Sequence, residues 1–320
     1  MSINQMPFNS QIARAEALMG QADTLARTLR LREALEALEQ AAQLWRTSGA
    51  AAEHRRCSLL AAETARLAGQ PERSRRHAIA ALEGADAGTE AQVHALLAAA
   101  DMAQGDAAGA EEQFSFAISL LPGAAAPAWW QARAQARMSL GRFGDAALDL
   151  EEASRRCIEV GDPASGRSAA VHAACAWHAA GRRDEAGRIL AEIEASAQAA
   201  RDDHALGAAE VLRATLSIEA GDPCEARTHL LSARKHALAS RSVDTYIAAA
   251  SALALLADRL GEHAQAYAAL ATGWATLADL TGPDLARSTF EPQLKALLQQ
   301  WGTLRFAAIK QQYERQPRNG

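Results

Sequence analysis

Small apolar residues, larger apolar residues and polar turns follow one another along this chain in a pattern that occurs eight times, at spacings of 36 to 41 residues. In its full form, each copy reads as a helix end, a glycine, a short polar turn and an alanine that opens the next helix. A fixed period in this range indicates stacked helical units that cannot bury their apolar faces alone. We call the glycine that follows the helix end, or Leu29 in the first copy, the mark of that copy. The marks are Leu29, Gly69, Gly105, Gly141, Gly181, Gly221, Gly261 and Gly302.

Positions at fixed distances from the marks carry the same residue types. Alanine stands seven residues before the mark in seven copies, with Lys295 in the eighth, and five residues after it in seven copies, with Ser74 in the second. A larger apolar residue, such as Phe114 or Leu150, stands nine residues after six of the marks. Small side chains let helices approach closely, and a larger one a turn further on fills the remaining space. The pattern predicts an all-α protein of about eight helix pairs.

These residues resemble the tetratricopeptide repeat (TPR) family, in its longer variety of about forty residues, over roughly residues 10–315. The resemblance rests on the alanine of the first helix, the glycine that closes it, and the alternation of alanine and a large residue in the second helix. It implies a right-handed α-solenoid of antiparallel helix pairs. Two features depart from the family. The aromatic residue four positions before the glycine occurs only as Trp177, and most second helices end at a glycine (Gly49, Gly84, Gly161 or Gly282) rather than a proline.

The repeat pattern also predicts how the chain is divided. We expect a loose N-terminus over residues 1–9 with Ser10 capping the first helix, repeats over 10–282, a C-terminal helical pair over 283–316 and a tail over 317–320. A solenoid grows by adding layers, so one elongated domain is expected rather than two. Two prolines and a glycine within residues 121–127 predict a loop between the third and fourth units, and this is the tightest candidate hinge.

The second helix of the last unit, residues 303–313, allows two interpretations. Its polar residues, among them Gln311 and Glu314 at positions that are apolar elsewhere, fit a cap that shields the last apolar layer from water. Its aromatic and aliphatic residues instead suit a homodimer contact. Those residues, with the neighbouring tryptophan, are Trp301, Phe306, Ile309 and Tyr313.

Composition and charge narrow the possible partners. Hydrophobic residues make up 49% of the chain but aromatic residues only 5%, and this alanine-rich content favours helices. The net charge of −5 argues against a broad nucleic-acid-binding face. The longest apolar run, residues 246–257, is too short to span a bilayer, and the N-terminus does not read as a secretory signal. We therefore expect a cytoplasmic protein with no nucleic acid partner and no membrane insertion.

One local basic cluster is either a solvated helix face or a site for an acidic partner. Its members are Arg55, Arg56, Arg66, Arg73, Arg75, Arg76 and His77.

The sequence gives little indication of catalytic or metal-binding residues. The four cysteines fall in different units without paired spacing, so neither a disulfide framework nor a zinc site is indicated. Cys175 lies between His172 and His178, but on a helix the two histidines diverge by roughly 120° and do not converge on one point. We expect no catalytic residue, no metal and no cofactor. Asp101 and Arg137, at equivalent positions in adjacent units, are predicted to form an ion pair.

The resemblance also implies a binding groove. In the family, side chains ten, six and three residues before the glycine line the concave surface that receives a partner. Several of them here are small or apolar and two are methionines, which suits an apolar or amphipathic segment. The lysines and asparagines with which some family members hold a terminal carboxylate are missing from these positions. The predicted groove residues are Leu59, Glu63, Arg66, Ala99, Met102, Gln131, Gln135, Met138, Val171, Cys175, His178, Val211, Thr215, Ile218 and Leu255.

The alternative is that these small residues are covered by the next turn of a tight superhelix or by the C-terminal helix, with no ligand at all. If the groove is open, the sequence predicts a non-catalytic scaffold or assembly factor that binds another protein or a peptide. A regulator that senses a small peptide is the second interpretation.

Overall fold

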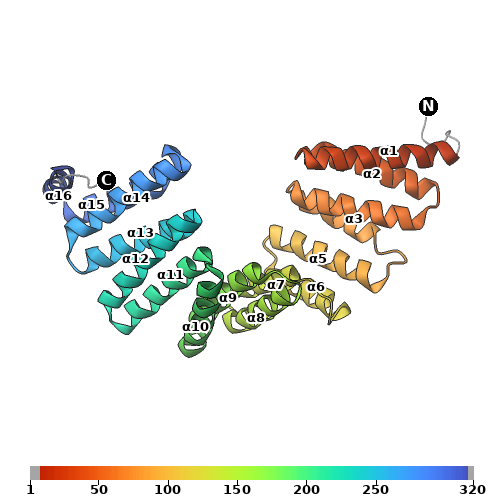
Figure 1. Cartoon of the computed structure of the whole chain (residues 1–320). Coiled ribbons are helices and arrows are strands. Elements are labelled where there is room, and N and C mark those ends of the chain that lie inside the picture. The colour runs from red at the N-terminus through yellow and green to blue at the C-terminus, as the bar shows by residue number, and fades with distance from the viewer. Residues whose placement is uncertain (1–7, 316–320) are drawn as a thin grey trace. The chain divides into compact units, whose positions relative to one another are not determined.

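Residues 8–315 are described by a computed structural model, and within that range the chain forms sixteen α-helices and no strand (Figure 1). Each repeat pairs a first helix with a second helix across a short turn, as the eight-copy pattern predicted. The first helices are α1 (Phe8–Arg27), α3 (Ala51–Leu67), α5 (Ala87–Ala103), α7 (Pro127–Ser139), α9 (Pro163–Ala179), α11 (Asp203–Ala220), α13 (Val243–Arg259) and α15 (Pro283–Trp301). The second helices are α2 (Leu31–Thr47), α4 (Pro71–Ala80), α6 (Ala107–Leu120), α8 (Phe143–Glu159), α10 (Arg183–Ala200), α12 (Pro223–Ser240), α14 (His263–Thr281) and α16 (Thr303–Arg315).

The helices divide into two compact units, one ending at Gly161 and the other beginning at Asp162. The boundary between these two units does not lie at the 121–127 segment, the hinge candidate of the sequence. That segment does form the loop between α6 and α7. Arg156 of α8 donates to the carbonyl oxygens of Pro122 (2.9 Å) and Ala125 (3.5 Å), and these bonds hold the loop inside the first unit.

Every mark residue ends a first helix in the left-handed backbone conformation, with φ between 59° and 82°. Glycine adopts this conformation readily, which explains its recurrence at seven of the marks. Leu29 takes the same conformation at φ 59° with its side chain 83% exposed. At the ends of the second helices α10 and α12, Arg201 and Arg241 are also left-handed. Helix α4 ends at Ala80, four residues before the glycine expected to stop it.

The small and large positions of the repeat form the core. The seven alanines that precede the marks by seven residues are at most 4% exposed. Five residues after the mark, six alanines and Ser74 are fully buried, while Ala307 in α16 is exposed. Ala307 differs because no further helix pair follows α16 within the described residues. The alternation of size thus sets how closely successive helices pack.

The ends of the described range correct one prediction. Helix α1 begins at Phe8, so Ser10 lies inside the helix and is not its cap. The rest of the expected loose N-terminus, residues 1–7, lies outside the described residues, as do residue 316 and the tail over 317–320.

At the other end, α16 packs its aromatic face onto α14 of the same unit. The rings of Phe306 and Tyr313 lie 5.5 and 5.4 Å, centroid to centroid, from the ring of Tyr267 in α14. The hydroxyl groups of Tyr313 and Thr272 are 3.2 Å apart. This packing supports the cap over the homodimer contact, because the aromatic residues are already engaged within the unit.

Candidate binding groove

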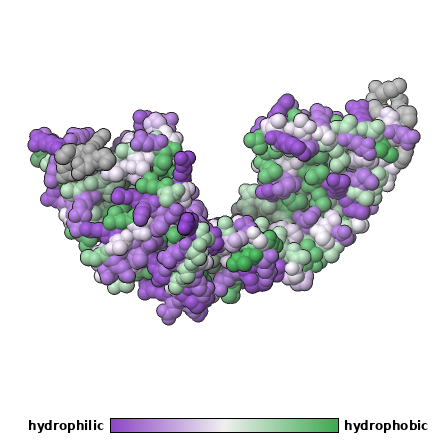
Figure 2. All heavy atoms as spheres, viewed as in Figure 1, coloured by the Kyte–Doolittle hydropathy of each residue, from purple (hydrophilic) through white to green (hydrophobic). Residues whose placement is uncertain are grey.

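The inner faces of three successive first helices, α3, α5 and α7, surround a pocket of about 520 Å³ in the first unit. A pocket of this size lies in the range of ligand-binding sites. Four of the predicted groove residues line it: Leu59, Glu63 and Arg66 from α3, and Ala99 from α5. In Figure 2, hydrophobic residues lie among hydrophilic ones over α3 and α5 of this unit. The structure therefore brings part of the predicted groove together at an accessible apolar surface.

Short side chains create the space. Four alanines face the pocket, two from α5 and two from α7, and between them the helices leave room that longer side chains would fill. The larger apolar walls are Leu59 and Leu60 on α3, Leu96 on α5 and Trp129 on α7. The four alanines are Ala95, Ala99, Ala128 and Ala132.

The predicted groove residues include four of the twelve that line the pocket, so sequence reasoning missed most of the lining. Leu60, Leu96 and Ala132 each stand nine residues before a mark, and Gln92 and Ala128 stand thirteen before one. These positions lie one turn from those used for the prediction, on the same helix face. The signal was present in the repeat, but the predicted register of ten, six and three was too narrow.

The polar edge of the pocket carries no net charge. Arg66 donates from Nε and Nη2 to the two carboxylate oxygens of Glu63, at 2.8 and 2.6 Å. The hydrogen bond to Glu63 raises the pKa of the Arg66 guanidinium, which stays protonated. Both side chains are more than 40% exposed, so the pair contributes little to stability. Its main effect is that neither charge is left without a partner.

The other predicted residues of the first unit lie outside the pocket. Met102 is half-buried and packs against the cluster around Phe114, which itself reaches the pocket. On α7, Gln131 and Met138 are half-buried and Gln135 is exposed.

In the second unit the predicted groove residues have mixed surroundings. Val171 is only 7% exposed, and its side chain lies in the core. Leu255 is 53% exposed, and Val211 is half-buried. Thr215 donates its hydroxyl to the Val211 carbonyl oxygen at 3.1 Å, and Ile218 packs half-buried against a core cluster.

Cys175 does not have the surroundings of a nucleophile. The residue is exposed, yet the protein atoms around its thiol desolvate it and raise the pKa of that thiol. A raised pKa lowers the fraction of reactive thiolate at neutral pH. The Nε2 atom of His178 lies 2.9 Å from a carboxylate oxygen of Glu219 and is engaged there.

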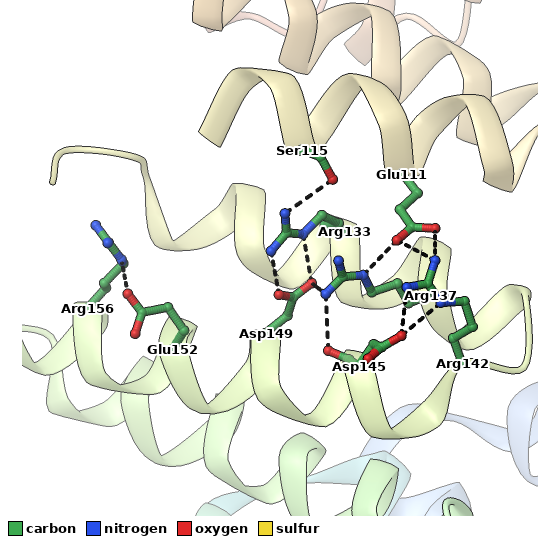
Figure 3. A network of polar contacts seen from close by, with 9 residues as sticks. All are labelled: Glu111, Ser115, Arg133, Arg137, Arg142, Asp145, Asp149, Glu152 and Arg156. Carbon is green, nitrogen blue, oxygen red and sulfur yellow. Dashed lines mark hydrogen bonds and ion pairs between the residues drawn. The ribbon is translucent and has the colours of Figure 1, made fainter. Parts of the chain in front are cut away.

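A buried ionic network holds α7, which carries Trp129, against its neighbours (Figure 3). Asp149 of α8 accepts hydrogen bonds from Arg133 at 2.9 and 2.6 Å, and it also pairs with Arg137 at 2.9 Å. Arg137 donates in addition to Glu111 of α6 at 2.9 Å. The Asp149 side chain is 3% exposed, so its charge depends on these partners. The network therefore positions the α7 wall of the pocket.

The predicted pair of Asp101 and Arg137 is wrong. Asp101 on α5 forms its ion pair with Arg75 of α4, whereas Arg137 on α7 pairs with acids of α6 and α8. The position four residues before the mark faces second helices, and not the equivalent position of the next first helix. Each charged residue at this position therefore finds its partner on a second helix.

Much of the basic cluster is neutralised within the first unit. Arg73 and His77 both contact the Glu39 carboxylate, at 2.6 and 2.9 Å, and Arg75 pairs with Asp101. Burial raises the pKa of Glu39, but the hydrogen bonds and charges of Arg73 and His77 outweigh it, so the pKa is lowered overall. These pairs favour the interpretation as an ordinary helix face over a site for an acidic partner.

Within residues 8–315, no three His, Cys, Asp or Glu side chains are grouped so that they would hold a metal ion. None of the sixteen helices combines the length and the apolar character that crossing a membrane requires.

The paired helices have a helical-repeat fold of the TPR type. No family model and no curated protein matches the sequence. Solved structures are similar: the apo form of the quorum sensor NprR from B. thuringiensis has 12% identity and a TM-score of 0.59, with 92% of this chain and 85% of that chain covered. A tetratricopeptide repeat protein from Parabacteroides merdae has 15% identity and a TM-score of 0.56, with 87% and 98% covered.

The apo form of RapI is a third similar structure, with 11% identity, a TM-score of 0.57, and 87% of this chain and 99% of that chain covered. At these identities the similarity establishes the fold alone. The predicted all-α, TPR-like solenoid is confirmed.

Proposed function

We propose that this protein is a non-catalytic interaction scaffold or assembly factor, which binds a segment of another protein along the inner faces of its first helices. The observation that carries the proposal is the apolar pocket between α3, α5 and α7, where four predicted groove residues meet. Accessible apolar surface of this kind is typical of interaction sites. The protein's location is proposed to be cytoplasmic, as the sequence predicted.

A peptide-sensing regulator is the second candidate. It is supported by the similarity to the quorum sensor NprR, which extends over 92% of this chain. The two candidates differ in the ligand, which is a partner protein in the first case and a free peptide in the second.

Affinity capture from the native lysate, followed by mass spectrometry, tests the proposal. A variant with glutamate at Met102, Met138 and Ile218 disrupts the first-helix faces. A matched control places glutamate at Leu148, Ile158 and Leu238, which are exposed on second helices. We expect a partner that the parent and the control retain and the groove variant loses, with circular dichroism showing that all three fold. Equal capture by all three, together with equal capture by an Ala128→Glu variant at the pocket wall, would refute groove binding.

A further inference from the structure

The pocket between α3, α5 and α7 is large enough for more than one side chain. A dry cavity of about 150 Å³ holds a benzene molecule, and this pocket measures about 520 Å³. Its apolar lining residues are aliphatic apart from Trp129 and Phe114. Two neighbouring apolar side chains of a partner therefore match it in size and in character.

The pocket favours an uncharged anchor. Glu63 and Arg66 neutralise each other at its edge, so a charged side chain that entered would lose water without gaining a free counter-charge. The side chains that enter are therefore leucine-like or aromatic.

The polar groups at the pocket indicate the backbone conformation of the partner. An extended segment presents an N–H and a C=O at every residue, and these need partners when they are desolvated. Beyond the paired Glu63 and Arg66, the only polar side chains among the lining residues are the amide of Gln92 and the indole of Trp129, which is too few to pair with the backbone of an extended segment. A helix satisfies its own backbone groups and needs only apolar contact from the groove.

We propose that this pocket binds an amphipathic α-helix of a partner protein through two uncharged apolar side chains spaced three or four residues apart. The inference rests on the proposed function and names the partner chemistry of the same site. Residues at this spacing project from one face of a helix, so both enter a single pocket. Ala99 lines the pocket from α5, and Ala128 lines it from α7.

Selection of random 15-residue peptides displayed on phage, on the full-length protein, tests this inference. Ala99→Leu and Ala128→Leu fill the pocket, and Ala128 is exposed, so its variant is the less disruptive. Ala103→Leu is the matched control, since Ala103 is exposed on α5 and does not line the pocket. Circular dichroism and thermal unfolding confirm that each variant is folded.

We expect enriched peptides to share two apolar residues at a spacing of three or four and to bind at least tenfold more weakly to both filled variants. Affinity for Ala103→Leu should stay within twofold of the parent. A proline placed between the two anchors should also weaken binding at least tenfold, because it breaks the helix. Peptides that tolerate this proline, or that depend on acidic residues, would overturn the proposal.

The selection separates this inference from the proposed function. Peptides that bind the filled variants normally but are lost on the variant at Met102, Met138 and Ile218 would refute the pocket and leave groove binding standing. Failure to enrich any peptide over the Ala99→Leu protein would also refute the pocket, while the lysate capture tests groove binding separately.

Discussion

The ring of Phe290 in α15 packs directly against the backbone of Gly273 in α14. Phe290 is fully buried, and a Cβ atom added at Gly273 would lie 3.0 Å from its Cζ atom and 3.3 Å from the Cβ atom of Ala250. Gly273 stands twelve residues after its mark, a position at which five other repeats carry alanine. The last helix pair therefore docks through an aromatic ring that occupies the place of a missing methyl group.

Gly273→Ala should destabilise the protein although it improves helix propensity. The gain in propensity is about 1 kcal/mol, while overpacking a buried site costs about 1–3 kcal/mol. We expect a net loss of about 1 kcal/mol, seen as a lower midpoint in thermal unfolding. Gly187→Ala is the control, because an added Cβ in α10 meets no atom within 4 Å and should raise the midpoint. A rise in both variants would contradict the packing described.

Leu29→Gly should stabilise the first unit. Leu29 holds φ 59°, a conformation that costs a residue with a side chain about 1–2 kcal/mol, and its exposed side chain contributes little burial. Glycine relieves this cost but loses more backbone entropy, so we expect a gain of about 0.5–1 kcal/mol. Urea unfolding measures the difference. Leu29→Ala keeps the strain, so equal stability of the glycine and alanine variants would contradict the explanation.

Asp149→Ala should be strongly destabilising. It leaves Arg133 and Arg137 without their shared carboxylate, and loss of one partner of a buried ion pair costs about 3–5 kcal/mol. Asp149→Asn keeps the shape of the side chain but removes its charge, and it replaces the alanine variant in this measurement if that variant does not fold. In double-mutant cycles, Arg137 should couple to Asp149 by more than about 1 kcal/mol and to Asp101 by nearly zero. A comparable coupling to Asp101 would reverse the assignment of partners.

The stability of the second unit should decrease in acid through Asp202. Its carboxylate caps α11 by accepting from the Ala205 N–H at 3.1 Å, and it also accepts from Arg167 at 2.7 Å. Burial opposes the charged form, but the Ala205 and Arg167 bonds prevail and lower the pKa of Asp202. A lowered folded-state pKa adds stability above the unfolded value of about 3.9, and that stability is lost as the pH falls through the folded value.

Asp202→Asn should therefore lower the urea midpoint at pH 7 and reduce its decline between about pH 5 and pH 2. Parallel curves for the parent and Asp202→Asn across this range would show that Asp202 does not carry the effect.

How far the sequence predicts the site depends on how local each feature is. The sequence predicted four lining residues because each stands at a fixed offset from its mark, on the same face of a first helix. These are Leu59, Glu63 and Arg66 on α3, and Ala99 on α5. Trp129 was missed although it lies on the next first helix. Its role depends on the rotation of α7 relative to α5, and the repeat pattern of either helix does not predict that rotation.

The sequence by itself determined the all-helical repeat, the number of helix pairs and the turn that ends each first helix. Glycine, alanine and the larger core residues act over one or two turns of a single helix, so their spacing is readable without partners. Only the tertiary structure decided that Asp101 pairs with Arg75, that Val171 lies in the core and that the chain divides at Gly161. Those outcomes depend on how neighbouring helices are rotated and packed, because a charge or an apolar side chain takes whichever partner that packing presents.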